Sequence, residues 1–323
     1  MDKVLITGGL GFIGKKLALE LQKQNKKVTI FDNSSRKNFN DLKISKKIKV
    51  INGDIRNKSD LIKATKNIDT VFHLAFINGT KFFYSKPKLV LEVGLKGTLN
   101  LLDAVQKSKK VKKIILASSS EIYQNPQKIP TPEEIEGIVP DVKNPRYSYG
   151  SAKLISEILL LHYLNRKKIK RIIFRPHNVY GPGMGFEHVV PEIIKKIFLA
   201  SNKFKKKETS IVINGTGSET RSFCYIDDAV RSIILLAKKG RDKSIYNVGN
   251  NDETKILDII KKISTILNIR VKIIKSKSPL GSAKRRNPDI KKILNLGYVK
   301  EFELNEGLIQ TVKWYKNFFL NNR

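Results

Sequence analysis

The chain has 323 residues, of which 40% are hydrophobic, so it is long enough to bury a core in one large domain or two modest ones. Its 63 basic and 29 acidic residues give a net charge of +34, which would attract phosphates, nucleic acid or an anionic membrane surface. The lysines are scattered, and the dense runs at 107–113 and 203–207 hold a single aromatic residue, Phe204, instead of the interleaved aromatic platforms of single-strand binders, which argues against specific nucleic-acid binding. The single cysteine, Cys224, excludes an internal disulfide framework and a cysteine-based metal site, and we expect no bound metal.

The chain opens on a strand followed by a glycine-rich loop. The apolar run Val4-Leu5-Ile6 predicts a strand, Gly8, Gly11 and Gly14 come next, and a helical pattern begins at about Phe12. Without side chains, these glycines let the backbone turn tightly and approach a pyrophosphate, whose charge is met by the N-terminus of the helix. In this strand-to-helix context the spacing predicts a dinucleotide-binding loop rather than a plain turn.

A carboxylate after the second predicted strand indicates which dinucleotide is bound. That strand covers Lys27 to Phe31, and Asp32 ends it, 18 residues after Gly14. A carboxylate there can accept hydrogen bonds from both ribose hydroxyls and repels a 2′-phosphate, which favours NAD over NADP. Arg36 keeps NADP open, because an arginine after this strand can accommodate the extra phosphate.

Strands and helical patterns then alternate along the chain. Further strands are predicted at Ile48 to Ile51, Val71 to Leu74, Lys113 to Ala117 and Arg171 to Phe174, and the longest helices at Leu89 to Lys107 and Pro145 to Lys168. Asp54 follows the first of these strands, where it can face the adenine or cap its own loop. The alternation predicts an α/β fold with a doubly wound parallel sheet, the Rossmann fold. We expect a NAD-binding domain over residues 1–176 and a smaller, mainly substrate-binding lobe over 177–323, with some segments returning to the sheet.

Two clusters carry groups suited to proton transfer. Ser118 to Glu121 come directly after the strand Lys113 to Ala117, at the edge where open α/β sheets bind ligands. Tyr149 and Lys153 lie one helical turn apart. Because a phenol ordinarily ionises only near pH 10, a nearby ammonium and the positive ring of an oxidised nicotinamide would favour its phenolate. The pair predicts removal of a hydroxyl proton as a hydride leaves the same carbon.

Together these motifs resemble the extended short-chain dehydrogenase/reductases, the nucleotide-sugar epimerase/dehydratase family. The resemblance runs from Lys3 to about Gly297 and rests on the segments Thr7–Gly14, His73–Ala75, Ser118–Tyr123, Tyr149–Lys153, Arg175–Pro182 and Thr220–Asp228. It implies that NAD is held by Gly8, Gly11, Phe12, Ile13, Gly14, Asp32, Asn33, Asp54, Ile55, Leu74, Ala75, Tyr149 and Lys153.

The same resemblance implies roles at the reacting centre. Tyr149 would be the base, Lys153 would hold the nicotinamide ribose, and Ser119 would be the catalytic hydroxyl, with Glu121 as a further catalytic group. A nucleotide-diphosphate sugar would be bound by Ser119, Ser120, Asn178, Arg221 and Arg286. Arginine forks match phosphate oxygens, and Arg285 could act in place of its neighbour.

Two positions depart from the family's pattern. Gly94 stands where an asparagine is common, and Phe76 follows His73-Leu74-Ala75 where a small residue is usual. The first change removes a side chain that often supports the active-site helix. The second is expected to reshape the pocket near the nicotinamide. Both bear on the sugar specificity more than on the first oxidation.

The resemblance leaves the reaction open. Members can begin by passing hydride from a sugar carbon, usually C4, to NAD while the tyrosine takes the hydroxyl proton. We expect a C4 epimerase, which needs no further acid or base. A 4,6-dehydratase or decarboxylase using Glu121 is the alternative. A non-catalytic NAD- and RNA-binding protein is a third hypothesis, which the intact Ser119, Tyr149 and Lys153 argue against.

The partners and the location are expectations as well. No apolar run approaches the roughly 18 residues of a membrane span, and a strand beginning at Lys3 leaves no room for a secretory segment. We therefore expect a cytoplasmic enzyme without membrane insertion. The resemblance also implies a homodimer in which the helices Leu89 to Lys107 and Pro145 to Lys168 pack against their copies, although their apolar stripes can instead face the sheet.

Overall fold

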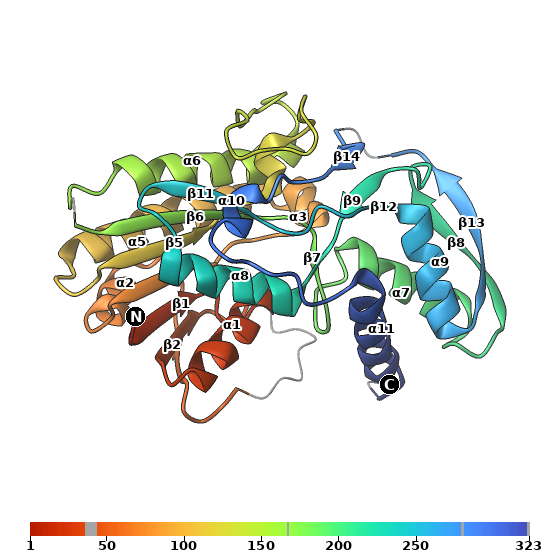
Figure 1. The fold of residues 1–323 in the computed structure, drawn as a ribbon, viewed down its shortest axis with the longest axis horizontal. Coiled ribbons are helices and arrows are strands. Elements are labelled where there is room, and N and C mark those ends of the chain that lie inside the picture. Colours follow the sequence, from red (N-terminus) through yellow and green to blue (C-terminus); the bar gives the residue numbers. More distant parts are fainter. Residues whose placement is uncertain (36–43, 167, 279–280, 322–323) are drawn as a thin grey trace.

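Seven parallel strands form the centre of the computed structural model, which describes residues 1–35, 44–166, 168–278 and 281–321 (Figure 1). Their order is β11-β6-β5-β4-β1-β2-β3, and each neighbouring pair is parallel. The strand order reverses between β1 and β4, so a crevice for a ligand is expected beyond their carboxyl ends. The strands are β1 Lys3–Thr7, β2 Lys27–Asp32, β3 Lys49–Asn52, β4 Thr70–His73, β5 Lys113–Ala117, β6 Lys170–Pro176 and β11 Ser244–Val248.

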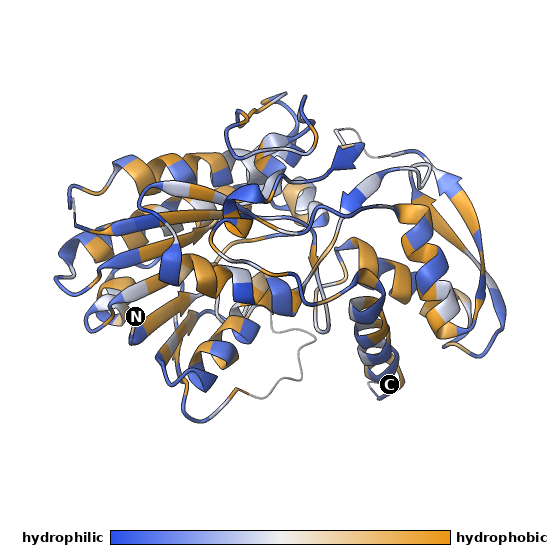
Figure 2. Cartoon of the chain, viewed as in Figure 1, coloured by the Kyte–Doolittle hydropathy of each residue, from blue (hydrophilic) through white to orange (hydrophobic). Residues whose placement is uncertain are grey.

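Alternating side chains of these strands build two cores, one on each face of the sheet. Val4 and Ile6 pack with helices α1 and α8, whereas Leu5 packs with α2, α5 and α6 on the opposite face. Figure 2 shows apolar residues along the central strands and on the helices that cover them. The predicted doubly wound sheet is confirmed. The covering helices are α1 Phe12–Lys23, α2 Lys58–Thr65, α5 Gly97–Lys107, α6 Ser148–His162 and α8 Ile226–Lys239.

The first of the two long predicted helices is divided. Residues 87–107 form α4 Pro87–Leu91, a π-helical turn η1 Glu92–Lys96, and α5, with α3 Thr80–Ser85 preceding them. A π-helical turn is rare and often lies at a functional site. It contains Gly94, one of the two positions that depart from the family's pattern.

The second long helix was predicted to end too late. It begins with the 3₁₀ turn η3 Pro145–Tyr147, and α6 ends at His162 rather than Lys168. Arg171 explains the early end, because its guanidinium donates to the carbonyl oxygens of Leu161, Leu164 and Arg166, which a longer helix would engage itself. At 18 residues, α11 Leu304–Asn321 is longer than α6, which has 15.

A lobe built from short strands and helices lies beside the sheet (Figure 1). The division at residue 176 stays a prediction, since β11 and α8 come from the second half of the sequence and belong to the sheet and its core. No helix in the described ranges combines the length and the apolar character needed to span a membrane. The remaining elements are η2 Ser120–Tyr123, β7 Val179–Tyr180, β8 Glu208–Asn214, β9 Thr220–Ser222, β10 Cys224–Tyr225, β12 Glu253–Lys255, β13 Arg270–Ser276, β14 Arg285–Arg286, α7 Val189–Ala200, α9 Ile256–Leu267 and α10 Lys291–Leu294.

Candidate active site

The glycine-rich loop between β1 and α1 leaves no room for side chains. Gly8 has a φ of +71°, and a Cβ there would lie 2.6 Å from Ala75 Cα on the neighbouring strand end. A Cβ on Gly14 would lie 2.4 Å from Gly8 O and 2.7 Å from Gly9 Cα. The loop therefore lets helix α1 approach the sheet closely, with the unpaired N–H groups of its first turn at the crevice. These residues fit a dinucleotide pyrophosphate.

The two carboxylates expected near the adenosine half lie at the ends of β2 and β3. Asp32 accepts hydrogen bonds from the backbone N–H groups of Leu10, at 3.0 Å, and Ser34, at 2.8 Å, so it fixes the glycine loop. Asp54 accepts from the Arg56 guanidinium at 2.8 and 3.0 Å and from Asn33 at 3.0 Å. The hydrogen bond from Arg56 lowers the pKa of Asp54 to about 2. Arg36 lies outside the described residues.

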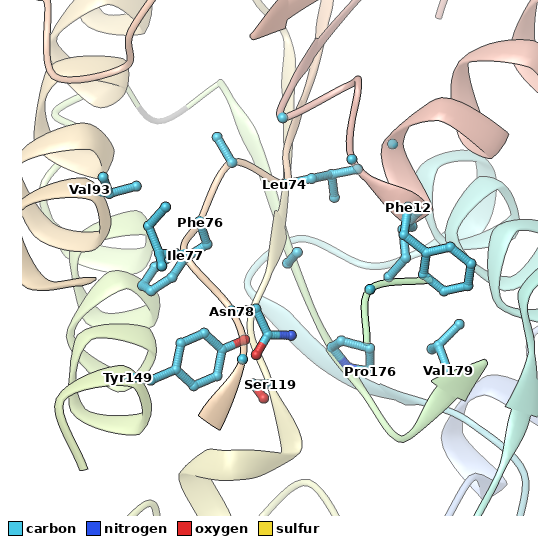
Figure 3. Close-up of a pocket in the computed structure, with 18 of the residues that line it drawn as sticks. Phe12, Leu74, Phe76, Ile77, Asn78, Val93, Ser119, Tyr149, Pro176 and Val179 are labelled. Carbon is cyan, nitrogen blue, oxygen red and sulfur yellow. The ribbon is translucent and has the colours of Figure 1, made fainter. Parts of the chain in front are cut away.

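One pocket runs from the glycine loop to β14, across the carboxyl ends of the sheet strands. Every predicted site residue lines it except Arg221. The predicted residues that it brings together are Gly8, Gly11, Phe12, Ile13, Gly14, Asp32, Asn33, Asp54, Ile55, Leu74, Ala75, Ser119, Ser120, Glu121, Tyr149, Lys153, Asn178 and Arg286. Figure 3 shows the Tyr149 ring, Ser119 and Asn78 together at this pocket.

Tyr149 and Lys153 lie on α6 and are both buried. The Lys153 ammonium donates to the carbonyl oxygen of Ala117, at the end of β5, over 2.6 Å. Burial lowers the pKa of Lys153 to about 7, although the carboxylate of Glu157 opposes the shift. Near neutral pH the charge of this lysine therefore responds to small changes in its surroundings.

Aromatic rings enclose the Tyr149 side chain. Phe83 of α3 stacks on its ring with centroids 4.7 Å apart, and Phe76 meets it edge to face at 5.2 Å. Both phenylalanines line the same pocket. These contacts fix the plane of the Tyr149 ring. The neighbouring side chains, rather than solvent, therefore determine the orientation of the phenol.

Glu121 is held by arginines at the far end of the pocket. Its carboxylate pairs with Arg286 of β14 and lies 4.0 Å from Arg146 of η3. Burial would raise the pKa of Glu121, but the positive charges of Arg286, Arg146 and Arg221 outweigh it and lower the pKa to about 2. The Nε atoms of Arg146 and Arg286 are buried and have no hydrogen-bond partner within the described part of the chain.

The four other residues predicted to bind substrate have different surroundings, and one of them, Ser120, is buried in the pocket lining. Asn178 donates to the carbonyl oxygen of Ser222 at 3.1 Å and lines the pocket. The Arg221 guanidinium donates to backbone oxygens of Thr220, Ala283 and Lys284, outside the pocket lining. Burial, and then the charge of Arg286, lowers the pKa of Arg221 to about 10. Ser119 accepts a hydrogen bond from the Glu121 N–H at 3.1 Å, so it caps η2.

Arg285 and Arg286 point to different sides of β14. Arg285 pairs with Glu253 at 2.7 and 2.9 Å and is exposed, whereas Arg286 lines the pocket against Glu121. The alternative that Arg285 replaces its neighbour in the pocket is therefore not supported by this arrangement.

Buried polar chains fix the strands beneath the pocket. The His73 ring bonds to Thr7 at 2.7 Å and to Thr98 at 3.2 Å, which joins β1, β4 and α5. Burial, with the charge of Lys153, lowers the pKa of His73 to about 3, so the ring is neutral at physiological pH. Arg175 of β6 forms a buried ion pair with Glu157 at 2.7 Å, which anchors α6.

Sequence reasoning missed several residues that lie in or against the site, among them Asn78, Phe83, Glu187 and Arg146. Asn78, Phe83 and Glu187 line the pocket, and Arg146 faces Glu121. None belongs to a motif with recognisable spacing. Asn78 and Glu187 come from the loops after β4 and β7, Phe83 from α3, and Arg146 from the turn η3 before α6. The only signal in the sequence was the position of Arg146, three residues before Tyr149.

Comparison with known proteins gives a consistent set of relatives. A sequence model of the NAD-dependent epimerase/dehydratase family matches residues 4–249. The chain is 30% identical to a UDP-N-acetyl-α-D-glucosaminuronate decarboxylase of Bacillus cytotoxicus, covering 97% of this chain and 98% of that protein. It is 31% identical to a putative UDP-glucose 4-epimerase of Methanocaldococcus jannaschii, covering 99% of each.

A solved structure with the same architecture is a UDP-N-acetylglucosamine 4-epimerase from Methanobrevibacter ruminantium in complex with UDP-N-acetylmuramic acid. Its TM-score to this chain is 0.85 at 27% identity, covering 98% of this chain and 99% of that one. The relatives thus share the fold over the full length but differ in the reaction that their names give.

Proposed function

The chain belongs to the NAD-dependent epimerase/dehydratase family of enzymes, and from that membership we propose that it is a nucleotide-sugar C4 epimerase. NAD, when bound, accepts a hydride from a sugar carbon and returns it. The glycine loop, Asp32 and Lys153 would hold this cofactor. Gly8 and Gly14 support the fit, because any side chain there would fill the space between β1 and α1.

The residues of the chain supply the proton transfer and the orientation. Tyr149 would take the proton of the sugar hydroxyl as a general base. Lys153, four residues on, would hold its ammonium beside the phenolate, and Ser119 would bond the reacting sugar oxygen. Because all three line one pocket, this division of roles requires no other base.

The state of Glu121 supports epimerisation over 4,6-dehydration. A dehydratase needs a carboxylate that removes the C5 proton, and a general base works best when its pKa lies near the working pH. Glu121 is instead paired with Arg286, close to Arg146, and has a pKa of about 2. Epimerisation requires only that the keto-sugar turn and take the hydride on its other face.

Glu121→Gln is expected to change kcat by less than about tenfold, because the amide keeps the shape and no proton transfer passes through this side chain. The change in kcat is measured by steady-state kinetics, with the substrate that the panel of nucleotide sugars described below identifies. A loss of about 10²-fold or more would instead assign general acid–base work to Glu121.

Decarboxylation of a sugar uronate is the second candidate, and the arginines favour it. Arg146 and Arg286 both keep a buried Nε without a partner in the described chain, and together they outnumber the single charge of Glu121. A C6 carboxylate of the substrate could pair with such guanidinium groups. Once C4 is a ketone, the C5–C6 bond can break without removal of the C5 proton: C6 leaves as carbon dioxide, the electron pair passes into the enolate of the C4 ketone, and C5 then takes up a proton.

Product masses from a panel of UDP-, GDP-, CDP- and dTDP-sugars, including uronates, decide between these reactions. The proposal expects an isomer of unchanged mass that chromatography separates from the substrate. Loss of carbon dioxide from a uronate would assign the second candidate. Loss of water would assign dehydration and contradict the argument from Glu121.

A homodimer through α6 is part of the proposal. Ile155 and Ile158 of α6 are 40% and 52% exposed, so this helix presents two neighbouring apolar side chains away from the core. Ile158→Lys is expected to convert a dimer into a monomer in light scattering. The control Leu199→Lys, at a 64% exposed leucine of α7, should leave the mass unchanged. Equal masses for wild type and Ile158→Lys would remove α6 from the interface.

A further inference from the structure

Phe76 and Gly94 lie against each other beside the Tyr149–Lys153 pair. A Cβ on Gly94 would lie 2.4 Å from Phe76 Cζ and 3.0 Å from Ala152 Cβ of α6. The ring of Phe76 thus occupies the space that a side chain at position 94 would need. The two departures from the family's pattern are therefore sterically coupled. The large side chain of Phe76 fits only because residue 94 has no side chain, and we call Phe76 and Gly94 one steric unit.

The ring of Phe76 contacts both groups of the proposed proton transfer. The Lys153 Nζ lies 3.8 Å from its centroid, compared with 5.8 Å from the centroid of the Tyr149 ring. Phe76 also meets Tyr149 edge to face, with an interplanar angle of 86°. The face of an aromatic ring attracts an ammonium, most strongly where water is excluded, and Lys153 is 3% exposed.

We propose that Phe76 is a positioning residue for the reaction: its ring, admitted by Gly94, keeps the Lys153 ammonium charged and in place beside the Tyr149 phenol. The inference rests on the proposed roles of Tyr149 and Lys153 and adds to them a residue that touches both. Phe76 comes from the loop after β4, Gly94 from the π-helical turn, and Lys153 from α6, so the unit joins three elements at the pocket.

Other groups also act on the Lys153 charge. Glu157, on the next turn of α6, favours the ammonium, and the Ala117 carbonyl oxygen accepts its hydrogen bond. The charge of Lys153 also acts on His73 of β4, but the His73 ring is itself neutral. Burial works against the ammonium and lowers the pKa of Lys153 to about 7. Loss of the ring should therefore favour the neutral amine at the pH where the enzyme works.

An absorbance titration of Tyr149 tests this without any sugar. The phenolate signal of the full-length, NAD-loaded protein is measured against pH, and the signal of Tyr149→Phe is subtracted. In Phe76→Leu the ammonium loses its proton at lower pH, so Tyr149 ionises with less positive charge beside it. The midpoint of phenolate formation should rise by up to about 1 pH unit, and the signal at neutral pH should fall.

Phe83→Leu is the matched comparison, because it removes a ring stacked on Tyr149 rather than one over the ammonium. Its midpoint should move less than that of Phe76→Leu. Phe76→Met serves as a second variant if the leucine variant does not fold. An unchanged midpoint in a folded Phe76 variant, or an equal shift in Phe83→Leu, would overturn the proposal. Because no substrate is used, this result is independent of whether the enzyme epimerises any sugar.

The steric half of the proposal has its own test. Gly94→Ala should lower the melting temperature by several degrees when Phe76 is present, because the new Cβ meets the ring. In the Phe76→Ala background the same substitution should cost much less, although the contact with Ala152 remains. Equal losses in the two backgrounds would show that positions 76 and 94 are not coupled.

Discussion

Tyr149→Phe is expected to lower kcat by about 10²–10⁴-fold, the usual contribution of a positioned general base. The substitution removes only the phenolic oxygen and keeps the ring that stacks on Phe83 and meets Phe76. The melting temperature and the NAD affinity should therefore stay near those of the wild type. Single-turnover kinetics with the substrate found in the sugar panel separates the chemical step from binding.

Tyr147→Phe is the control for this prediction. Tyr147 lies two residues earlier, in η3, is also buried, and does not belong to the pocket lining. Its variant should retain wild-type turnover. If Tyr149→Phe turned over sugar as fast as Tyr147→Phe, the proposed base would have to be another group.

Gly14→Ala is expected to damage both the fold and NAD binding. The new methyl group would lie within 2.7 Å of two backbone atoms of the glycine loop, Gly8 O and Gly9 Cα, and neither can rotate away as a side chain would. Such overpacking costs about 1–3 kcal/mol of unfolding free energy. If α1 moves away from β1, the NAD dissociation constant should rise roughly tenfold for each 1.4 kcal/mol of binding energy lost.

Gly11→Ala separates crowding from the mere loss of a glycine. Gly11 has a φ of −71°, which any residue adopts, and among the described residues its Cβ would meet only Gly8 O, at 3.2 Å. Thermal unfolding should therefore show a clearly smaller loss of stability than for Gly14→Ala. Equal melting temperatures for Gly14→Ala and the wild type would contradict the close approach of α1 to the loop.

The fold could be predicted well because its signals are local and periodic. Buried parallel strands appear in a sequence as short apolar runs. Each of the six strands predicted between Val4 and Phe174 forms a strand of the sheet. The ends of the helices were harder to predict from the sequence. The end of α6 depends on Arg171, a residue of the following strand that bonds the last carbonyls, and no pattern within the helix reveals that contact.

The candidate site, too, could be predicted from the sequence only in part. Residues in motifs, such as Gly14, Tyr149 and Lys153, could be placed at the pocket because strand ends and helical spacing determine their positions. The pairing of Glu121 with Arg286 could not, since the two are far apart in sequence and meet only because β14, which pairs with β9 outside the seven-stranded sheet, lies against η2. Phe76 and Gly94 were recognised as departures, but their contact required coordinates.

In the proposed reaction a sugar carbon gives a hydride to NAD bound in the pocket and takes it back, while Tyr149 takes and returns the hydroxyl proton. Its most direct test uses a UDP-sugar deuterated at C4, with the full-length enzyme in ordinary water and the product examined by mass spectrometry and NMR. A hydride that leaves for NAD and returns predicts that the deuterium stays on C4 of the product. Replacement of that deuterium by hydrogen from water during turnover would contradict a reversible hydride transfer at C4.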